Sequence, residues 1–210
     1  MNCRVRVRIV LILATLAAGV LCNGCFVLTS ERRYKPEASS SEVRSLRSGE
    51  ELSYSRFIES DVVTLEIGVR NSPGTWELGF LFWVLPFPIN YDYVATQPMT
   101  VDVFVEPKSA NVTFDPSKTF FLNANQGPAS PGRIFYNHEW FGTNDSRAFP
   151  ITSRSRFVLE FSLWNNAHPN RYAPFQLRVQ GLGVGEDPIR FSPLNFKPIT
   201  VVWPQFRLPY

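Results

Sequence analysis

The chain has 210 residues and a formal net charge of +3, from 21 Lys and Arg against 18 Asp and Glu. Arg4, Arg6 and Arg8 lie in the first 24 residues, which hold no acid, so the remainder carries 18 basic residues (21 − 3) against 18 acidic ones. Because this remainder is neutral, its net charge does not favour binding to nucleic acid, and we expect no such partner.

Residues 1–24 read as an export signal. The three arginines precede Ile9–Leu21, an uncharged run in which Thr15 is the only polar side chain. A helix that spans a bilayer needs about 20 apolar residues, so this run is short for a permanent span. A basic segment followed by a short apolar run is typical of a cleaved export signal. An uncleaved leader that anchors the chain by a single span is the alternative.

The leader ends in Leu21-Cys22-Asn23-Gly24-Cys25. This pattern resembles the end of a bacterial lipoprotein signal, in which a small residue precedes a cysteine that is lipidated and becomes the new N-terminus. Gly24 matches the small residue and Cys25 the lipidated one. Cys22 departs from the pattern, because the family prefers Leu three residues before the cysteine. The resemblance implies lipid attachment at Cys25 in the bacterial cell envelope, and Phe26 in place of a retention Asp implies the outer membrane.

The cysteines support this interpretation. Cys3, Cys22 and Cys25 are the three cysteines of the chain, so residues 26–210 have none. Exported domains usually use cysteines for disulfides, and this one has none to pair. Thiolate catalysis and cysteine-ligated zinc are excluded for the same residues. We therefore expect Cys25 to serve attachment.

Residues 25–51 are polar and rich in serine, as in Ser39-Ser40-Ser41. They predict a flexible tether, which as a coil would span on the order of 25–30 Å. Ser39 and Glu42 have the spacing of a capping box, but Val43 and Leu46 alone give little apolar stripe for a helix.

From residue 52 to residue 210 the dominant period of the apolar residues is two, as in half-buried strands. Of the 17 Pro and 12 Gly of the whole chain, 16 Pro and 9 Gly lie in this part and interrupt these short runs. The pattern predicts one all-β domain of about 160 residues, a single antiparallel β-sandwich of immunoglobulin-like architecture. The predicted strands are 63–70, 101–106, 111–114, 119–122, 157–161, 175–179 and 199–203.

The most apolar stretch runs from Trp76 to Tyr91. We expect a central strand, buried on both faces, over Trp76–Leu85. For Pro86–Tyr93 the two prolines predict an irregular segment, either in the core or on the surface. If aromatic side chains reach the surface, they form a binding patch for glycan, lipid or protein. Its candidate residues are Trp83, Phe87, Tyr91, Tyr93, Trp140 and Trp164.

No catalytic motif accompanies these strands. His138-Glu139 lacks the second histidine of a zinc protease motif, and His168 lies in an Asn- and Pro-rich loop. Gly181–Gly185 has the wrong spacing for a phosphate loop, so we expect a turn between strands. We therefore expect no cofactor, no metal and no enzymatic activity, but a structural or interaction role in the envelope. A carbohydrate-binding or adhesive module is the first alternative, and a hydrolase with dispersed carboxylates is the second.

Overall fold

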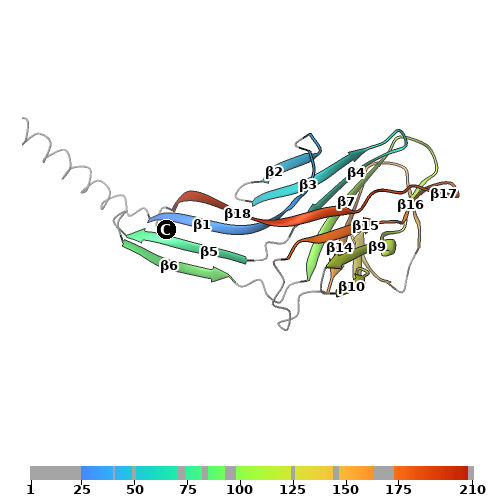
Figure 1. Ribbon diagram of the computed structural model, residues 1–210. Coiled ribbons are helices and arrows are strands. Elements are labelled where there is room, and N and C mark those ends of the chain that lie inside the picture. Colours follow the sequence, from blue (N-terminus) through green and yellow to red (C-terminus); the bar gives the residue numbers. More distant parts are fainter. Residues whose placement is uncertain are drawn as a thin grey trace, which may run out of the picture. The chain divides into compact units, whose positions relative to one another are not determined.

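The computed structural model describes residues 25–39, 41–48, 51–70, 74–81, 85–92, 98–123, 126–143, 147–162 and 173–207 (Figure 1). Within these ranges the chain forms β-strands and one short 3₁₀ turn, η1 (Pro116–Lys118). The all-β prediction is confirmed. The leader, residues 1–24, lies outside the described residues.

The chain divides into two compact units. Unit 1 consists of Met1–Glu31, Gly74–Tyr93 and Val201–Tyr210, and unit 2 consists of Arg32–Pro73 and Val94–Thr200. The sequence suggested a single domain from residue 52. That domain boundary stays a prediction. Two long strands, β1 (Cys25–Pro36) and β18 (Leu194–Arg207), contribute residues to both units. A period of two identifies a strand but does not show where along its length its partners change.

In unit 2, one sheet has seven strands in the order β12-β11-β14-β7-β4-β3-β2. Every neighbouring pair in it is antiparallel. Its strands are β2 (Val43–Ser48), β3 (Glu51–Glu59), β4 (Val63–Val69), β7 (Met99–Pro107), β11 (Arg133–Tyr136), β12 (Glu139–Gly142) and β14 (Ser155–Phe161).

A second sheet of unit 2 has the order β10-β9-β15-β18-β1, and a smaller one has the order β13-β8-β16-β17. The remaining strands of these sheets are β8 (Val112–Phe114), β9 (Thr119–Asn123), β10 (Gln126–Ala129), β13 (Phe149–Ile151), β15 (Phe175–Val179), β16 (Leu182–Val184) and β17 (Asp187–Pro188). Each strand predicted from the sequence in this unit coincides with one of these or with β4, β7 or β14.

The core of unit 2 follows from the alternation of its strands. In β7, alternate residues from Met99 to Val105 are fully buried, and the intervening ones are partly exposed. Strand β9 and strand β14 meet in the core, where the rings of Phe121 and Phe161 lie 6.0 Å apart. Buried side chains from all three sheets join in one hydrophobic cluster. Such burial is the main favourable contribution to folding.

The stretch expected to be a flexible tether is mostly strand. Strand β1 covers Cys25–Pro36 and β2 covers Val43–Ser48. Tyr34 is 2% exposed, and its ring lies edge-on at 4.8 Å from that of Phe175. The polar composition suggested a coil because Phe175, which packs against Tyr34, lies far away along the chain. Ser39 and Glu42 hydrogen-bond through their side chains in the turn between β1 and β2, without a helix.

The apolar stretch that begins at Trp76 forms two strands of unit 1, β5 (Gly74–Leu81) and β6 (Leu85–Asp92). The expected strand is confirmed over Trp76–Leu81, but it ends there and does not reach Leu85. The irregular segment expected from Pro86 is wrong, because Pro86 lies within β6. In unit 1 the strand order is β18-β1-β5-β6, which places β6 at the edge of the sheet (Figure 1). An edge strand tolerates proline because one side of it needs no N–H donors for a neighbour.

A tight contact joins η1 to β16. The N–H of Asp115 donates to the carbonyl of Gly181 at 2.8 Å. A Cβ atom at position 181 would lie 1.9 Å from the carbonyl oxygen of Asp115, so only glycine fits there. The sequence predicted a turn over Gly181–Gly185; instead Leu182–Val184 is strand β16 and the turn follows it, with Gly185 at φ +59°.

Candidate functional site

Cys25 is the first residue of strand β1. The other candidate for lipidation, Cys22, lies outside the described residues. From Cys25 the chain continues into the sheet with no intervening loop, because β1 runs without interruption to Pro36. A group attached to Cys25 would therefore be joined directly to the strands of unit 1.

The six candidates for an aromatic patch do not all lie in the described residues. Trp83, Tyr93 and Trp164 are outside them. Phe87 and Tyr91 are on β6 in unit 1, where Phe87 pairs with Gly79 and Tyr91 pairs with Trp76. Trp140 is on β12 in unit 2 and is 43% exposed.

Trp140 is presented by a two-residue hairpin between β11 and β12. Asn137 and His138 have φ angles of 48° and 67°, as both central residues of a type I′ turn require. This places Trp140 directly across from Phe135, with ring centroids 5.1 Å apart and planes inclined by 53°. The guanidinium of Arg133 lies 4.3 Å from the Trp140 ring centroid. The rings of Phe135 and Trp140 are therefore tilted relative to each other and partly covered by Arg133. These two rings do not form the coplanar aromatic surface on which a sugar ring would stack.

The same face of the seven-stranded sheet carries a buried carboxylate on β4. Glu66 is 5% exposed, and its two oxygens have different donors. The Ser55 hydroxyl donates to Oε1 at 2.7 Å, and Nη2 of Arg154 donates to Oε2 at 3.0 Å. Arg154 also lies 5.2 Å from the ring centroid of Phe104. A buried carboxylate is tolerated when it is paired and hydrogen-bonded in this way.

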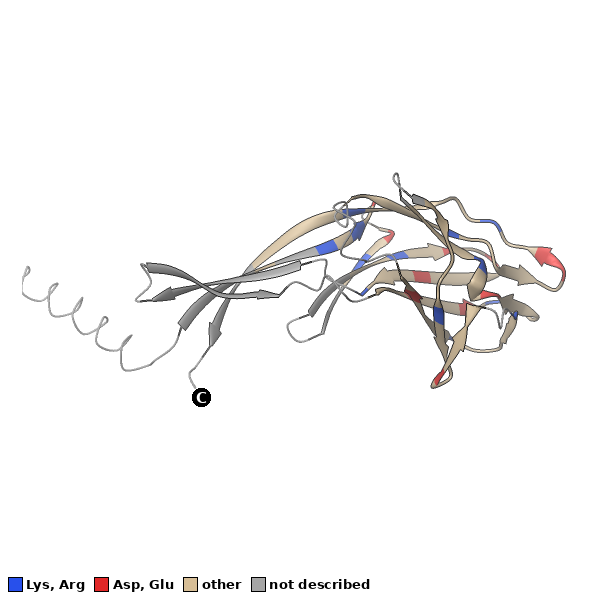
Figure 2. Ribbon diagram, turned by 90° about the horizontal axis from the view of Figure 1, so that it is seen from below, with Lys and Arg blue, Asp and Glu red and all other residues tan. Residues whose placement is uncertain are grey.

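A second acidic residue on this face is shared by two arginines. Arg70 donates to both oxygens of Asp102, at 3.0 and 2.8 Å, and Arg156 donates to Oδ1 at 3.0 Å. Lys and Arg positions are interspersed with Asp and Glu positions over unit 2, as Figure 2 shows. Ion pairs between opposite charges thus occupy this face.

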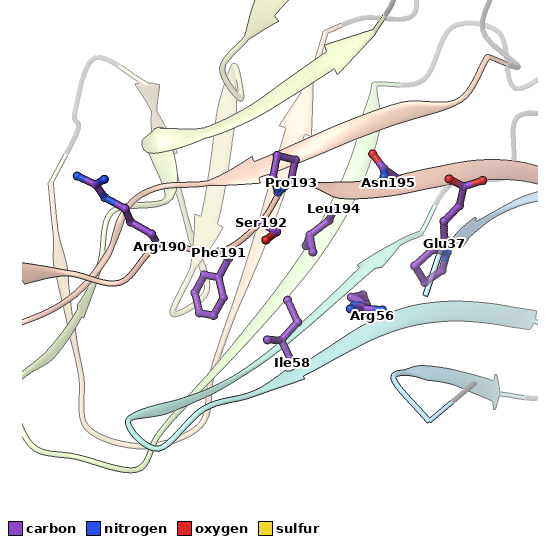
Figure 3. A pocket seen from close by; sticks show the side chains of 10 residues that line it. Glu37, Arg56, Ile58, Arg190, Phe191, Ser192, Pro193, Leu194 and Asn195 are labelled. Atoms are coloured by element: carbon purple, nitrogen blue, oxygen red, sulfur yellow. The ribbon is translucent and has the colours of Figure 1, made fainter. Parts of the chain in front are cut away.

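A pocket of about 330 Å³ opens between β3 and the segment that leads into β18 (Figure 3). Arg56 and Ile58 line it from β3, and Arg190 and Phe191 line it from the other segment. Arg56 is 17% exposed and pairs with Glu42 at 2.9 Å. Its Nε and Nη1 atoms are buried, so they do not face the open pocket. The polar residues Glu37, Ser192 and Asn195 also line the pocket.

Asp115 is the buried acid at the start of η1 whose ionisation the structure favours. Burial, the largest influence, would raise its pKa, but hydrogen bonds from Ser117 and the ammonium of Lys118 outweigh it. Together they hold the pKa of Asp115 below its ordinary value. The ammonium of Lys118 lies 3.1 Å from the carboxylate. Because the same carboxylate accepts from the Ser117 N–H at 3.2 Å, its role is to cap η1.

The described part of the chain contains no cluster of three or more His, Cys, Asp or Glu side chains that could hold a metal ion. His138 is exposed at the tip of the β11–β12 hairpin, as expected of a loop residue, and His168 lies outside the described ranges. Among the described residues no helix is long and apolar enough to span a membrane.

The chain matches no protein-family model, no curated protein and no solved structure.

Proposed function

We propose that this chain is a lipid-anchored, non-enzymatic protein of the bacterial cell envelope, with a structural or interaction role. One observation carries the proposal: Cys25, the only cysteine after residue 22, follows Gly24 at the end of an export-type leader. In this proposal the leader is removed before Cys25, and the cysteine bears the lipid that holds the protein at the outer membrane. A single acyl chain binds a membrane only reversibly, so a diacylglyceryl group with a further N-acyl chain is what makes the anchor durable.

The part of the protein that is displayed at the membrane is, in this proposal, a β-sandwich with immunoglobulin-like architecture formed by unit 2. Its support is the hydrophobic cluster to which the antiparallel sheets contribute, including the Phe121–Phe161 contact. Two facing antiparallel sheets around one core are a common scaffold for recognition on cell surfaces. The paired charges on the outer face of β4 and β7 suit a stable, solvated surface for contacts with another envelope component.

The test is metabolic labelling with a radioactive fatty acid in a bacterial host, followed by separation of membranes. The unmodified chain should incorporate label and sediment with membranes, and Cys25→Ala should lose both properties. Cys22→Ala is the matched control, because it removes a cysteine three residues away, and it should keep both. Globomycin, which blocks the lipoprotein signal peptidase, should leave the leader attached. Label that persists in Cys25→Ala would overturn the proposal.

A further inference from the structure

Unit 1 has a composition unlike that of a solvated domain. Its described strands contain four charged residues: Glu31, Glu77, Asp92 and Arg207. They also contain aromatic residues on all four strands, namely Phe26, Trp76, Phe80, Phe87, Tyr91, Trp203 and Phe206. Val202 on β18 is 54% exposed, which shows that an apolar side chain of this unit faces out. Exposed apolar residues that gather in one patch mark a site of contact with another protein or a membrane.

The start of β1 fixes where unit 1 must be if the leader anchors the chain. A lipid on Cys25 and an uncleaved span ending near residue 24 both place the membrane surface at the first residue of β1. Strand residues rise by about 3.3 Å each, so Cys25–Glu31 can extend only roughly 20 Å from that point. Strands β5 and β6 follow β1 in the sheet order, at spacings of about 4.8 Å per strand. Within the described residues, Cys25 leads into β1 without a linker that would let the unit stand clear of the bilayer.

The edge of the sheet suits a lipid surface better than a second protein strand. Strand β6 is the edge, and it carries Pro86 opposite Phe80 and Pro88 opposite Leu78. Proline has no N–H, so two donors that would be left unsatisfied in a poorly hydrated layer are absent. The same prolines weaken edge-to-edge pairing with another copy of the chain.

From these observations we propose that unit 1, whose strands carry tryptophan and tyrosine residues, docks on the phospholipid headgroup layer. Aromatic rings with a polar atom concentrate at this level of the bilayer. The sheet lies at the interface and does not cross the membrane, because an open sheet edge is not tolerated in the hydrocarbon core. This inference rests on the proposed membrane attachment, and it assigns unit 1 a second, non-covalent contact with the same membrane.

The experiment uses the mature chain, residues 25–210, with Cys25→Ser, so that no lipid is attached. The protein is mixed with vesicles of phosphatidylethanolamine and phosphatidylglycerol and floated through a density gradient. It should float with the vesicles, and vesicles carrying brominated lipid should quench its tryptophan fluorescence. Changing the cross-strand pair, Trp76→Ser with Tyr91→Ser, removes two aromatic side chains and should reduce the vesicle partition coefficient at least about tenfold. Trp140→Ser in unit 2 is the matched control and should leave it unchanged.

Each outcome separates the possibilities. A folded protein, judged by circular dichroism and thermal unfolding, that neither floats nor shows quenching would overturn the inference. Flotation that is equally strong in the Trp76/Tyr91 variant and the Trp140 variant would also overturn it. A lipid-free dimer that the Trp76/Tyr91 substitutions dissociate would assign the unit to a second copy instead. Because the tested protein has no cysteine, a negative result leaves fatty-acid labelling of Cys25 as an independent test of the proposed function.

Discussion

The guanidinium of Arg154, the residue before β14, donates a hydrogen bond of 3.0 Å to the carboxylate of Glu66 on β4, although 88 positions separate them in the sequence. Glu66 is 5% exposed, whereas the Arg154 side chain is 55% exposed, so the pair connects a buried acid to the surface. Asp102, on the neighbouring strand, is held instead by two arginines, Arg70 and Arg156. We therefore expect the removal of one arginine to change the free energy of unfolding by different amounts in the two arrangements.

Arg154→Ala should lower the free energy of unfolding by about 1–3 kcal/mol, since it leaves the buried Glu66 carboxylate with only the Ser55 hydroxyl. Arg156→Ala is the matched control, because Arg156 also lies over Phe104 and is similarly exposed. Asp102 keeps both hydrogen bonds from Arg70 in that variant, so the loss should be at most about 1 kcal/mol. Urea unfolding of the two variants measures the difference. Equal losses would mean that Glu66 does not depend on Arg154.

Gly181→Ala should destabilise unit 2 by about 1–3 kcal/mol, because its methyl group would overlap the backbone of Asp115 and force the strands apart. Gly127→Ala provides the control, since a Cβ at position 127 meets no atom within 4 Å. That variant should change the free energy of unfolding by less than about 1 kcal/mol. Thermal unfolding compares them, and an unchanged melting temperature for Gly181→Ala would contradict the close approach.

Stability should fall in acid partly through Asp115. Its pKa is lower in the folded protein than its ordinary value, so the unfolded chain binds the proton more readily. The stabilisation is present in full above the ordinary pKa of about 4 and is lost as pH falls through the lower, folded value. Asp115→Asn should be less stable than the unmodified chain at pH 6, and this difference should shrink towards pH 3. A constant difference across this range, measured by urea unfolding, would exclude the carboxylate as the cause.

The strands of unit 2 could be predicted because alternation such as that of Val101 to Val105 is imposed by the pleat itself. The division into two units could not be predicted. The alternation of residues in β1 and β18 does not show where along each strand its neighbouring strands change. Tyr34 looked like part of a coil because its partner, Phe175, is remote in the sequence. Pro86 and Pro88 looked like strand breakers because the edge position of β6 depends on the sheet order.

For the candidate site, the sequence pointed to Cys25 through the neighbouring Gly24 and the absence of later cysteines. Trp140 was also predicted as a surface residue, and its exposure agrees with that. The ion pairs of Glu66 and Asp102 were missed because these acids and arginines lie on or beside three different strands, β4, β7 and β14, and so give no local signal. The strand alternation did place Glu66 and Asp102 on the non-core face, which is the only sequence feature that pointed to them.

The most direct test of lipid attachment is mass spectrometry of the mature N-terminus, from protein extracted from membranes and digested with trypsin. The attachment at Cys25 predicts that the first peptide is Cys25–Arg32 and that it carries a diacylglyceryl group on the sulfur and an acyl chain on the amine. An unmodified Cys25 within an intact peptide Ile9–Arg32 would show that the leader is retained, and it would contradict the account.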